Sequence, residues 1–91
     1  MSKVFWTEPA REVRDKAVEY IARNNLRAAL TQLGEIQKQT ERLLTYPHLG
    51  RPSRIRGARE LSINRTSFLV VYRILGDNIH IFRFYHTSRR R

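Results

Sequence analysis

The chain opens with a short apolar segment that is followed by apolar residues at helical spacing. The triplet VFW predicts a first strand over about residues 3–6. Thr7 offers a hydroxyl group to cap a helix, and Glu8 and Pro9 are typical of a first helical turn. We therefore expect a helix over about residues 8–23.

A second stretch has a clearer apolar stripe and predicts a helix over about residues 26–45. Its apolar side chains recur at steps of three and four, which places them on one helix face. They are Leu26, Ala29, Leu30, Leu33, Ile36, Leu43 and Leu44, with Thr40 on the same stripe between Ile36 and Leu43. Only Asn24 and Asn25 separate the helices, so an antiparallel hairpin is expected. Trp6 and Tyr20 fall on apolar stripes and are expected in the core.

Strand-forming residues dominate the rest of the chain. Strands are expected over about residues 59–64, 68–75 and 79–86, and the Gly-Asp-Asn sequence at 76–78 predicts a tight turn between the last two. The fold class is therefore α+β. One domain, residues 1–91, should begin with a strand and pack an antiparallel helix hairpin on one face of a small antiparallel sheet.

A two-residue turn fixes which side chains share a face of the sheet, because it pairs Arg73 with His80 or Phe82. The more aliphatic face should carry the helices: Phe68, Val70, Tyr72, Ile74, Ile79, Ile81, Arg83 and Tyr85. The other face should be bare: Leu69, Val71, Arg73, Leu75, His80, Phe82, Phe84 and His86. An apolar surface of that size is typical of an interaction site.

Charge is concentrated in the second half of the chain. The net charge is +10, and residues 46–91 carry ten basic side chains against two acidic ones. Such a field attracts a polyanion or an acidic protein. Cysteine is absent and no apolar run approaches about 18 residues, which favours a soluble cytoplasmic protein. The three histidines are not spaced as metal ligands, and no metal or cofactor is expected.

The densest cluster of positive charge is the loop sequence RPSRIRGAREL at residues 51–61. It contributes Arg51, Arg54, Arg56 and Arg59, and Arg65 follows shortly after. Arginine is always charged and offers planar donors to phosphate or carboxylate groups. So many cations predict an anionic partner.

Short motifs along nearly the whole chain resemble one family. They are Val4-Phe5-Trp6-Thr7-Glu8-Pro9-Ala10, Tyr46-Pro47-His48-Leu49-Gly50-Arg51, Arg56-Gly57-Ala58-Arg59-Glu60-Leu61, Val71-Tyr72-Arg73-Ile74 with Gly76, Ile81-Phe82-Arg83 and His86-Thr87-Ser88-Arg89. In this order the chain resembles the RelE/ParE superfamily of toxins from type II toxin–antitoxin modules. The resemblance implies a small basic toxin that a partner antitoxin covers in a hetero-oligomer. The ribosome-dependent branch cleaves mRNA, and the ParE-like branch inhibits DNA gyrase.

The nuclease alternative needs groups that move protons and stabilise a phosphorane. The candidates are His86 and Tyr85 for proton transfer and Arg54, Arg56, Arg65 and Arg73 for charge. The resemblance implies a catalytic role for His86 and places basic residues of those nucleases at Arg54 and Arg56. Leu69 stands where those nucleases usually place an arginine, and losing it could cost several kcal/mol of transition-state stabilisation.

The ParE-like motifs favour a gyrase-inhibiting toxin over a ribosome-dependent nuclease or a non-toxic basic nucleic-acid-binding module. They favour a non-catalytic inhibitor, whereas the RelE-like alternative would make the protein an endoribonuclease. The basic tail, residues 86–91, is expected to contribute to toxicity. The residues expected to bind the target or the antitoxin are Arg51, Arg54, Arg56, Arg59, Arg65, Leu69, Val71, Arg73, Phe82, Phe84, His86, Arg89 and Arg90.

Overall fold

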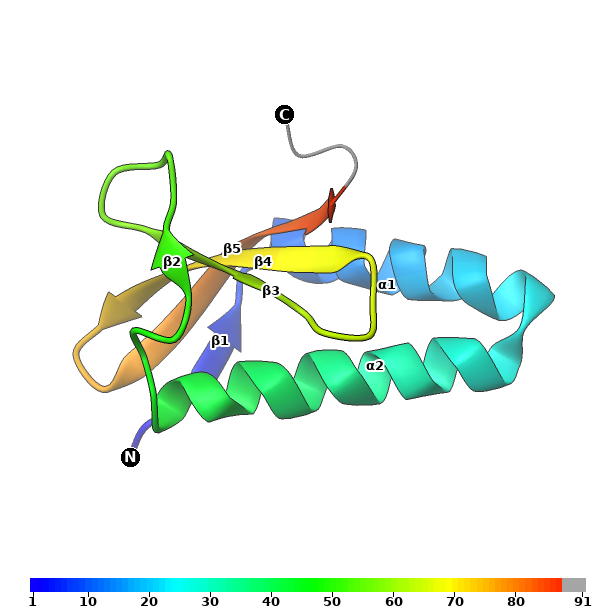
Figure 1. Cartoon of the computed structure of the whole chain (residues 1–91), viewed down its shortest axis with the longest axis horizontal. Coiled ribbons are helices and arrows are strands. Elements are labelled where there is room, and N and C mark those ends of the chain that lie inside the picture. The colour runs from blue at the N-terminus through cyan, green and yellow to red at the C-terminus, as the bar shows by residue number, and fades with distance from the viewer. Residues whose placement is uncertain (88–91) are drawn as a thin grey trace.

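A helix hairpin lies against one face of a five-stranded sheet in the computed structural model, which describes residues 1–87 (Figure 1). The elements follow in the order β1 (Val4–Trp6), α1 (Glu8–Asn24), α2 (Leu26–Glu41), the 3-10 turn η1 (Arg42–Leu44), β2 (Arg51–Pro52), β3 (Arg59–Ser62), β4 (Phe68–Leu75) and β5 (Asn78–His86). The order of strands in the sheet is β1-β5-β4-β3-β2.

The expected α+β fold is confirmed, with one difference in the sheet. Strand β1 pairs with β5 in parallel, so the sheet is mixed and not wholly antiparallel. The other neighbouring strands are antiparallel. The short strand β2 was not expected, since two residues that include a proline give no periodic signal.

Local hydrogen bonds explain where the helices begin and end. The Thr7 hydroxyl accepts from the Ala10 amide at 3.3 Å and caps α1. The Asn25 amide donates to the Ile21 carbonyl at 2.9 Å, and its side-chain oxygen accepts from the Ala28 amide at 3.0 Å. Asn25 therefore ends α1 and also begins α2, so the expected break in the hairpin is a single residue.

The main core fills the space between the helices and the sheet. Its buried side chains are Ala10, Ile36, Leu43, Ile63, Phe68, Val70, Tyr72, Ile79, Ile81 and Phe84. The Tyr72 hydroxyl donates to the Pro47 carbonyl at 2.6 Å and accepts from the Gly50 amide at 3.0 Å. Burial raises the pKa of Tyr72 above its ordinary value, which keeps the hydroxyl available as a donor. These bonds fix the segment that leads into β2.

The pairing of β4 with β5 contains a bulge that the alternation of residues did not predict. Arg73 lies opposite His80, as the two-residue turn requires. Val71, however, lies opposite Arg83, and the register shifts between Val71 and Tyr72. Phe82 is thus the extra residue on β5, and such a residue reverses the alternation of every side chain that follows.

The bulge corrects the predicted faces of the sheet beyond Phe82. Phe84 is only 4% exposed and packs in the core against Phe68, with ring centroids 4.9 Å apart. His86 makes an edge-on contact with Phe68 on the same side. Arg83 lies opposite Val71 and Tyr85 lies opposite Leu69, on the face of the sheet away from the helices. The predictions that Phe84 and His86 lie on the bare face, and that Arg83 and Tyr85 lie on the helix face, are therefore wrong.

The helix hairpin extends beyond the sheet, which exposes part of its apolar stripe (Figure 1). Tyr20, Leu26 and Leu30 are 67%, 62% and 59% exposed, and Val13 is 49% exposed. Tyr20 was expected in the core and is not there. The helical spacing was read correctly, but the far end of the hairpin has no strand beneath it to bury these side chains.

Candidate functional site

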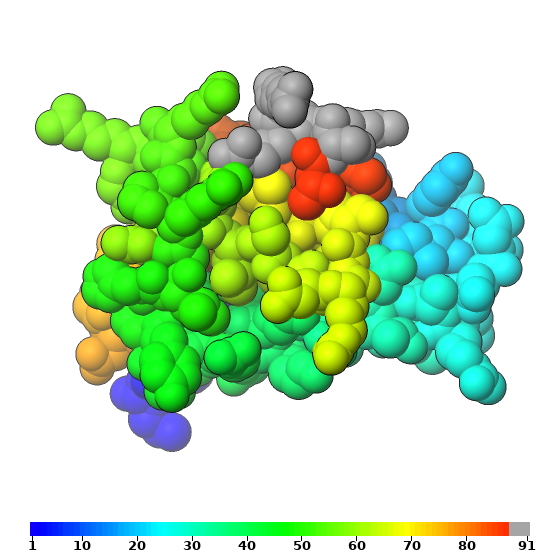
Figure 2. All heavy atoms as spheres, in the orientation of Figure 1, coloured from blue at the N-terminus to red at the C-terminus, as the bar shows by residue number. Residues whose placement is uncertain are grey.

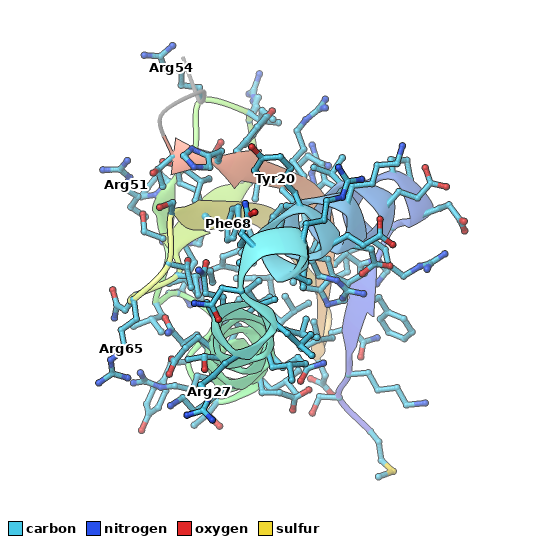
Figure 3. The ribbon with its side chains drawn as sticks, turned by 90° about the vertical axis from the view of Figure 1, so that its right-hand side faces the viewer. Tyr20, Arg27, Arg51, Arg54, Arg65 and Phe68 are labelled. Carbon is cyan, nitrogen blue, oxygen red and sulfur yellow. The ribbon has the colours of Figure 1, made fainter. Side chains whose placement is uncertain are left out.

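Two surfaces carry the chemistry that a partner could recognise. The first is an apolar groove of about 820 Å³ between the helix hairpin and the end of the sheet. It is lined by Val13, Lys16, Ala17, Tyr20, Ile21, Gln32, Ser67, Phe68, Phe84, Tyr85 and His86. Figure 3 looks onto this side of the molecule and labels Tyr20 and Phe68. We call it the helix–sheet groove.

The groove contains residues that the sequence analysis did not predict as site residues. Val13 and Tyr20 are large, apolar and exposed, and they are about two helical turns apart on α1. His86, a predicted site residue, also lines this groove and not the opposite face. A long apolar stripe on a helix beside a small sheet was the available signal, because a short sheet cannot cover it.

The second surface lies on the sheet face away from the helices, and we call it the arginine face. Its centre is not bare. Leu69 and Val71 are each 2% exposed and pack with Ala58, while Ile55 and Phe82 pack around them. The loop between β2 and β3 covers the strand residues that were expected to be open. The prediction of a wide apolar face is therefore corrected to a small second core.

The loop over this second core is held closed by its own hydrogen bonds. The Ser53 amide donates to the Ala58 carbonyl at 3.0 Å, and the Ala58 amide donates to the Ile55 carbonyl at 3.0 Å. Gly57 turns the chain at a φ of 77°, where a side chain would be strained. The loop projects from the body of the molecule between β2 and β3 (Figure 2).

Arg54 and Arg56 are carried by this loop and point away from the protein. Both are exposed, and neither has an ion pair with any residue of the described part of the chain. Figure 3 shows Arg54 extending outward at one corner of the molecule. Because Ile55 packs inward between them, the two cations are displayed from a fixed base.

Other arginines of the predicted cluster are already satisfied within the protein. Arg51 pairs with Glu60 at 2.9 Å, and the Glu60 side chain is only 4% exposed. Arg59 donates to the Gly50 carbonyl at 2.5 Å. Arg51 therefore offsets part of the cost of burying the Glu60 carboxylate. These two arginines stabilise the turn into β2 and β3.

Arg65 belongs to a separate network that ties the loop between β3 and β4 to α2. Arg65 donates to Glu35 at 3.3 Å. Gln39 donates to Glu35 at 2.7 Å and to the Asn64 carbonyl at 3.0 Å, and it accepts from the Asn64 amide at 2.8 Å. The hydrogen bond from Gln39, helped by Lys38 and Arg65, lowers the pKa of Glu35 below its ordinary value.

A stacked arginine and aromatic ring complete the arginine face. The guanidinium carbon of Arg73 lies 4.4 Å from the ring centroid of Phe82, and that of Arg83 lies 5.9 Å away. Arg83 reaches this face because of the bulge, since it directly follows the extra residue Phe82. Arg73 and Arg83 have no carboxylate partner within residues 1–87.

The residues implied for mRNA cleavage are dispersed. Arg73 lies opposite His80, and His86 is at the far end of the same strand, a separation of about 20 Å along the strand. The two side chains also lie on opposite faces of the sheet. Leu69, which stands where those nucleases usually place an arginine, is buried under the loop. This position therefore offers no cation to a phosphate. Arg89 and Arg90 lie outside the described residues.

The described residues contain neither a metal site nor a membrane-spanning helix. Among residues 1–87, no group of three or more histidine, cysteine, aspartate or glutamate side chains comes together as a metal site would require. Within the same residues, neither helix has the length and apolar run needed to cross a membrane.

Comparison with known proteins gives consistent matches over the chain. Residues 4–91 match the family of the ParE toxin of the type II toxin–antitoxin system parDE. A Sinorhizobium fredii protein named "Putative toxin Y4kP" is 30% identical over 88 residues, which is 97% of this chain and 91% of that protein. A solved structure titled "Chromosomal ParDE TA system from P. aeruginosa" has a TM-score of 0.81 and 27% identity, covering 94% of this chain and 96% of that one.

Proposed function

The chain belongs to the ParE family of toxins from type II toxin–antitoxin systems, and from this membership we propose that it arrests growth by inhibiting DNA gyrase and is neutralised by a cognate antitoxin. The observation that carries the proposal is the family match over residues 4–91, which includes both helices and the whole sheet. The dispersal of the residues implied for mRNA cleavage supports an inhibitor that acts by binding.

The helix–sheet groove supports the antitoxin part of the proposal. Its lining includes the exposed Val13 and Tyr20 together with Phe68 and Phe84, which suits an amphipathic segment that buries apolar side chains. A solvent-exposed apolar surface of this kind is a liability unless a partner covers it. The strongly basic character of the chain suits an antitoxin segment that is acidic where it leaves the groove.

Growth of cells that express the chain tests the toxin activity directly. We expect expression of the chain alone to stop growth and to induce the DNA damage response, with filamentous cells and intact mRNA. Co-expression of the small neighbouring reading frame should restore growth. New mRNA 5′ ends without DNA damage would contradict inhibition of gyrase and favour a ribosomal nuclease. Normal growth would contradict toxicity altogether.

Substitution in the groove separates binding of the antitoxin from action on the target. Val13→Asp places a charge in the apolar lining, so we expect toxicity to remain and rescue by the antitoxin to be lost. Gln37→Asp, at an exposed position of α2 outside the lining, is the matched control and should be rescued normally. Rescue of both variants would show that the antitoxin binds elsewhere.

A further inference from the structure

The arginine face has cations without ion-pair partners among residues 1–87 beside a surface on which a ring can stack. The stability of the fold does not account for this combination. Arg51, Arg59 and Arg65 have partners that hold loops in place. Arg54 and Arg56 have none among the described residues, although keeping them close together costs Coulomb repulsion. Cations that do nothing for the fold are free to meet an external anion.

Acidic groups that could neutralise this face are scarce. Residues 46–91 contain only Glu60 and Asp77 as carboxylates. Glu60 is buried and paired with Arg51, and Asp77 lies in the turn at the other end of the hairpin, between β4 and β5. The potential over the arginine face is therefore strongly positive.

The stacked pair on this face points to a more specific ligand than a simple anion. Arg73 lies over the ring of Phe82 at 4.4 Å and is partly exposed, so its guanidinium plane offers an outer face on which a flat ring can stack. Tyr85 adds a second partly buried ring on the same side. Bases stack on arginine planes and aromatic rings when they are unpaired.

We propose that the arginine face binds single-stranded nucleic acid, with Arg54 and Arg56 on successive phosphates and a base stacked on Arg73 over Phe82. A duplex hides its bases in the stack, so it can use the phosphate contacts but not the stacking surface. This activity goes beyond inhibition of gyrase and does not depend on it, since it is a property of the isolated chain.

The test uses the purified full-length chain, free of antitoxin, and fluorescence anisotropy with labelled oligothymidylate of about 20 nucleotides, long enough to cover such a site. Oligouridylate of the same length, a duplex of equal length and poly-glutamate serve as the other probes. Titrations between about 50 and 200 mM salt report the number of phosphate contacts through the salt dependence of the affinity.

We expect the single strands to bind more tightly than the duplex and poly-glutamate. The double variant Arg54→Ala/Arg56→Ala should reduce the salt slope for the single strand by about 1.4, or about 0.7 for each lost contact. The matched control Arg23→Ala/Arg27→Ala removes the same charge from exposed positions of the helices. It should leave the slope unchanged, since Arg27 lies far from Arg54 (Figure 3).

The stacking contact has its own variant. Arg73→Lys keeps the positive charge but removes the planar group, so binding of the single strand should weaken about fivefold or more while binding of the duplex stays the same. Circular dichroism of each variant checks that the fold is retained. A preference for thymidylate or uridylate would tell DNA from RNA as the ligand, and either preference supports the proposal.

Three results would overturn it. Equal losses in the two double variants would mean that only net charge attracts the probe. Binding of poly-glutamate as tight as that of the single strands would identify an acidic protein segment as the occupant. Duplex binding equal to single-strand binding, with no effect of Arg73→Lys, would remove the stacking contact.

Discussion

The two faces of the sheet are closed in different ways. The face beneath the helices is covered by two long elements and contains the large core, including Tyr72 and Phe84. The opposite face is closed at its centre by one short loop, which brings Ile55 over Leu69 and Val71. The first face uses the apolar stripe of the helices for stability, whereas the second leaves arginines and a stacked ring at the surface. The contrast separates a face whose buried side chains mainly stabilise the fold from a face that presents arginines without carboxylate partners among residues 1–87.

The contrast depends on the bulge at Phe82, so the largest effect should come from comparing Phe82 itself with Phe84, which follows the bulge. Phe84→Ala removes a buried ring and should cost about 3–5 kcal/mol of unfolding free energy. Phe82→Ala removes a partly exposed ring and should cost about 1 kcal/mol. Urea denaturation followed by circular dichroism measures both. Equal costs would contradict the bulged register.

The close packing of Gly50, the residue before β2, against Tyr72 and Glu60 can be tested by substitution. A methyl group there would lie 2.6 Å from the Glu60 carbonyl oxygen and 2.7 Å from the Tyr72 hydroxyl. We expect Gly50→Ala to cost about 1–3 kcal/mol because both neighbours must move. Gly34→Ala is the matched control within α2, where nothing lies within 4 Å. It should stabilise the protein by about 0.5–1 kcal/mol, and a similar cost at both positions would refute the close approach.

The smallest expected effect concerns the network of Glu35, Gln39 and Arg65, which ties α2 to the loop between β3 and β4. The pKa of Glu35 is lowered in the folded protein, so its charged form contributes stability above its ordinary value of 4.5. That contribution is lost as the pH falls below 4.5 and through the lowered folded value. Thermal denaturation between about pH 6 and 3 measures it, since carboxylates titrate there.

A substitution isolates this carboxylate from the others that titrate in the same range. Glu35→Gln should flatten the fall in melting temperature at acid pH. Glu41→Gln, exposed and without an ion pair in the part of the chain that the structure describes, serves as the control and should retain the fall. An unchanged acid profile in Glu35→Gln would show that the network adds nothing to stability.

Much of the fold followed from local signals. The cap at Thr7 and the break at Asn25 define the helices, and the turn before Asn78 fixes the register near Arg73. These features depend on neighbours within a few residues, so a short stretch of sequence is enough to predict them. The parallel pairing of β1 with β5 is different, because it joins strands that are far apart along the chain.

The positions of the apolar residues on β5 are compatible with a bulge, but an assumption of strict alternation hides this. Buried residues on β5 are odd-numbered at Ile79 and Ile81 and then even-numbered at Phe84. Phe82 and Tyr85 add apolar residues of both parities, so the sequence fits either register. Which register forms depends on the packing of Phe84 against the helices. That packing is a tertiary property, and the face assignment of Phe84 and His86 failed for this reason.

The sequence predicted which residue types form the candidate sites better than it predicted where each residue lies. The arginine cluster was recognised, but its division into paired and free members depends on distant partners. Arg65 meets Glu35, a residue thirty positions earlier, and Arg51 meets Glu60 across a strand pair. The helix–sheet groove was missed because the helical stripe does not reveal where the sheet ends.

The shared cap at Asn25 has a consequence for how the hairpin comes apart. Helix ends normally fray independently, since each has its own unsatisfied groups. Here one residue bonds to the last turn of α1 and to the first turn of α2. The two ends must therefore loosen together, and the hairpin opens as one cooperative segment. Hydrogen exchange should report a common opening free energy for amides on both sides of Asn25.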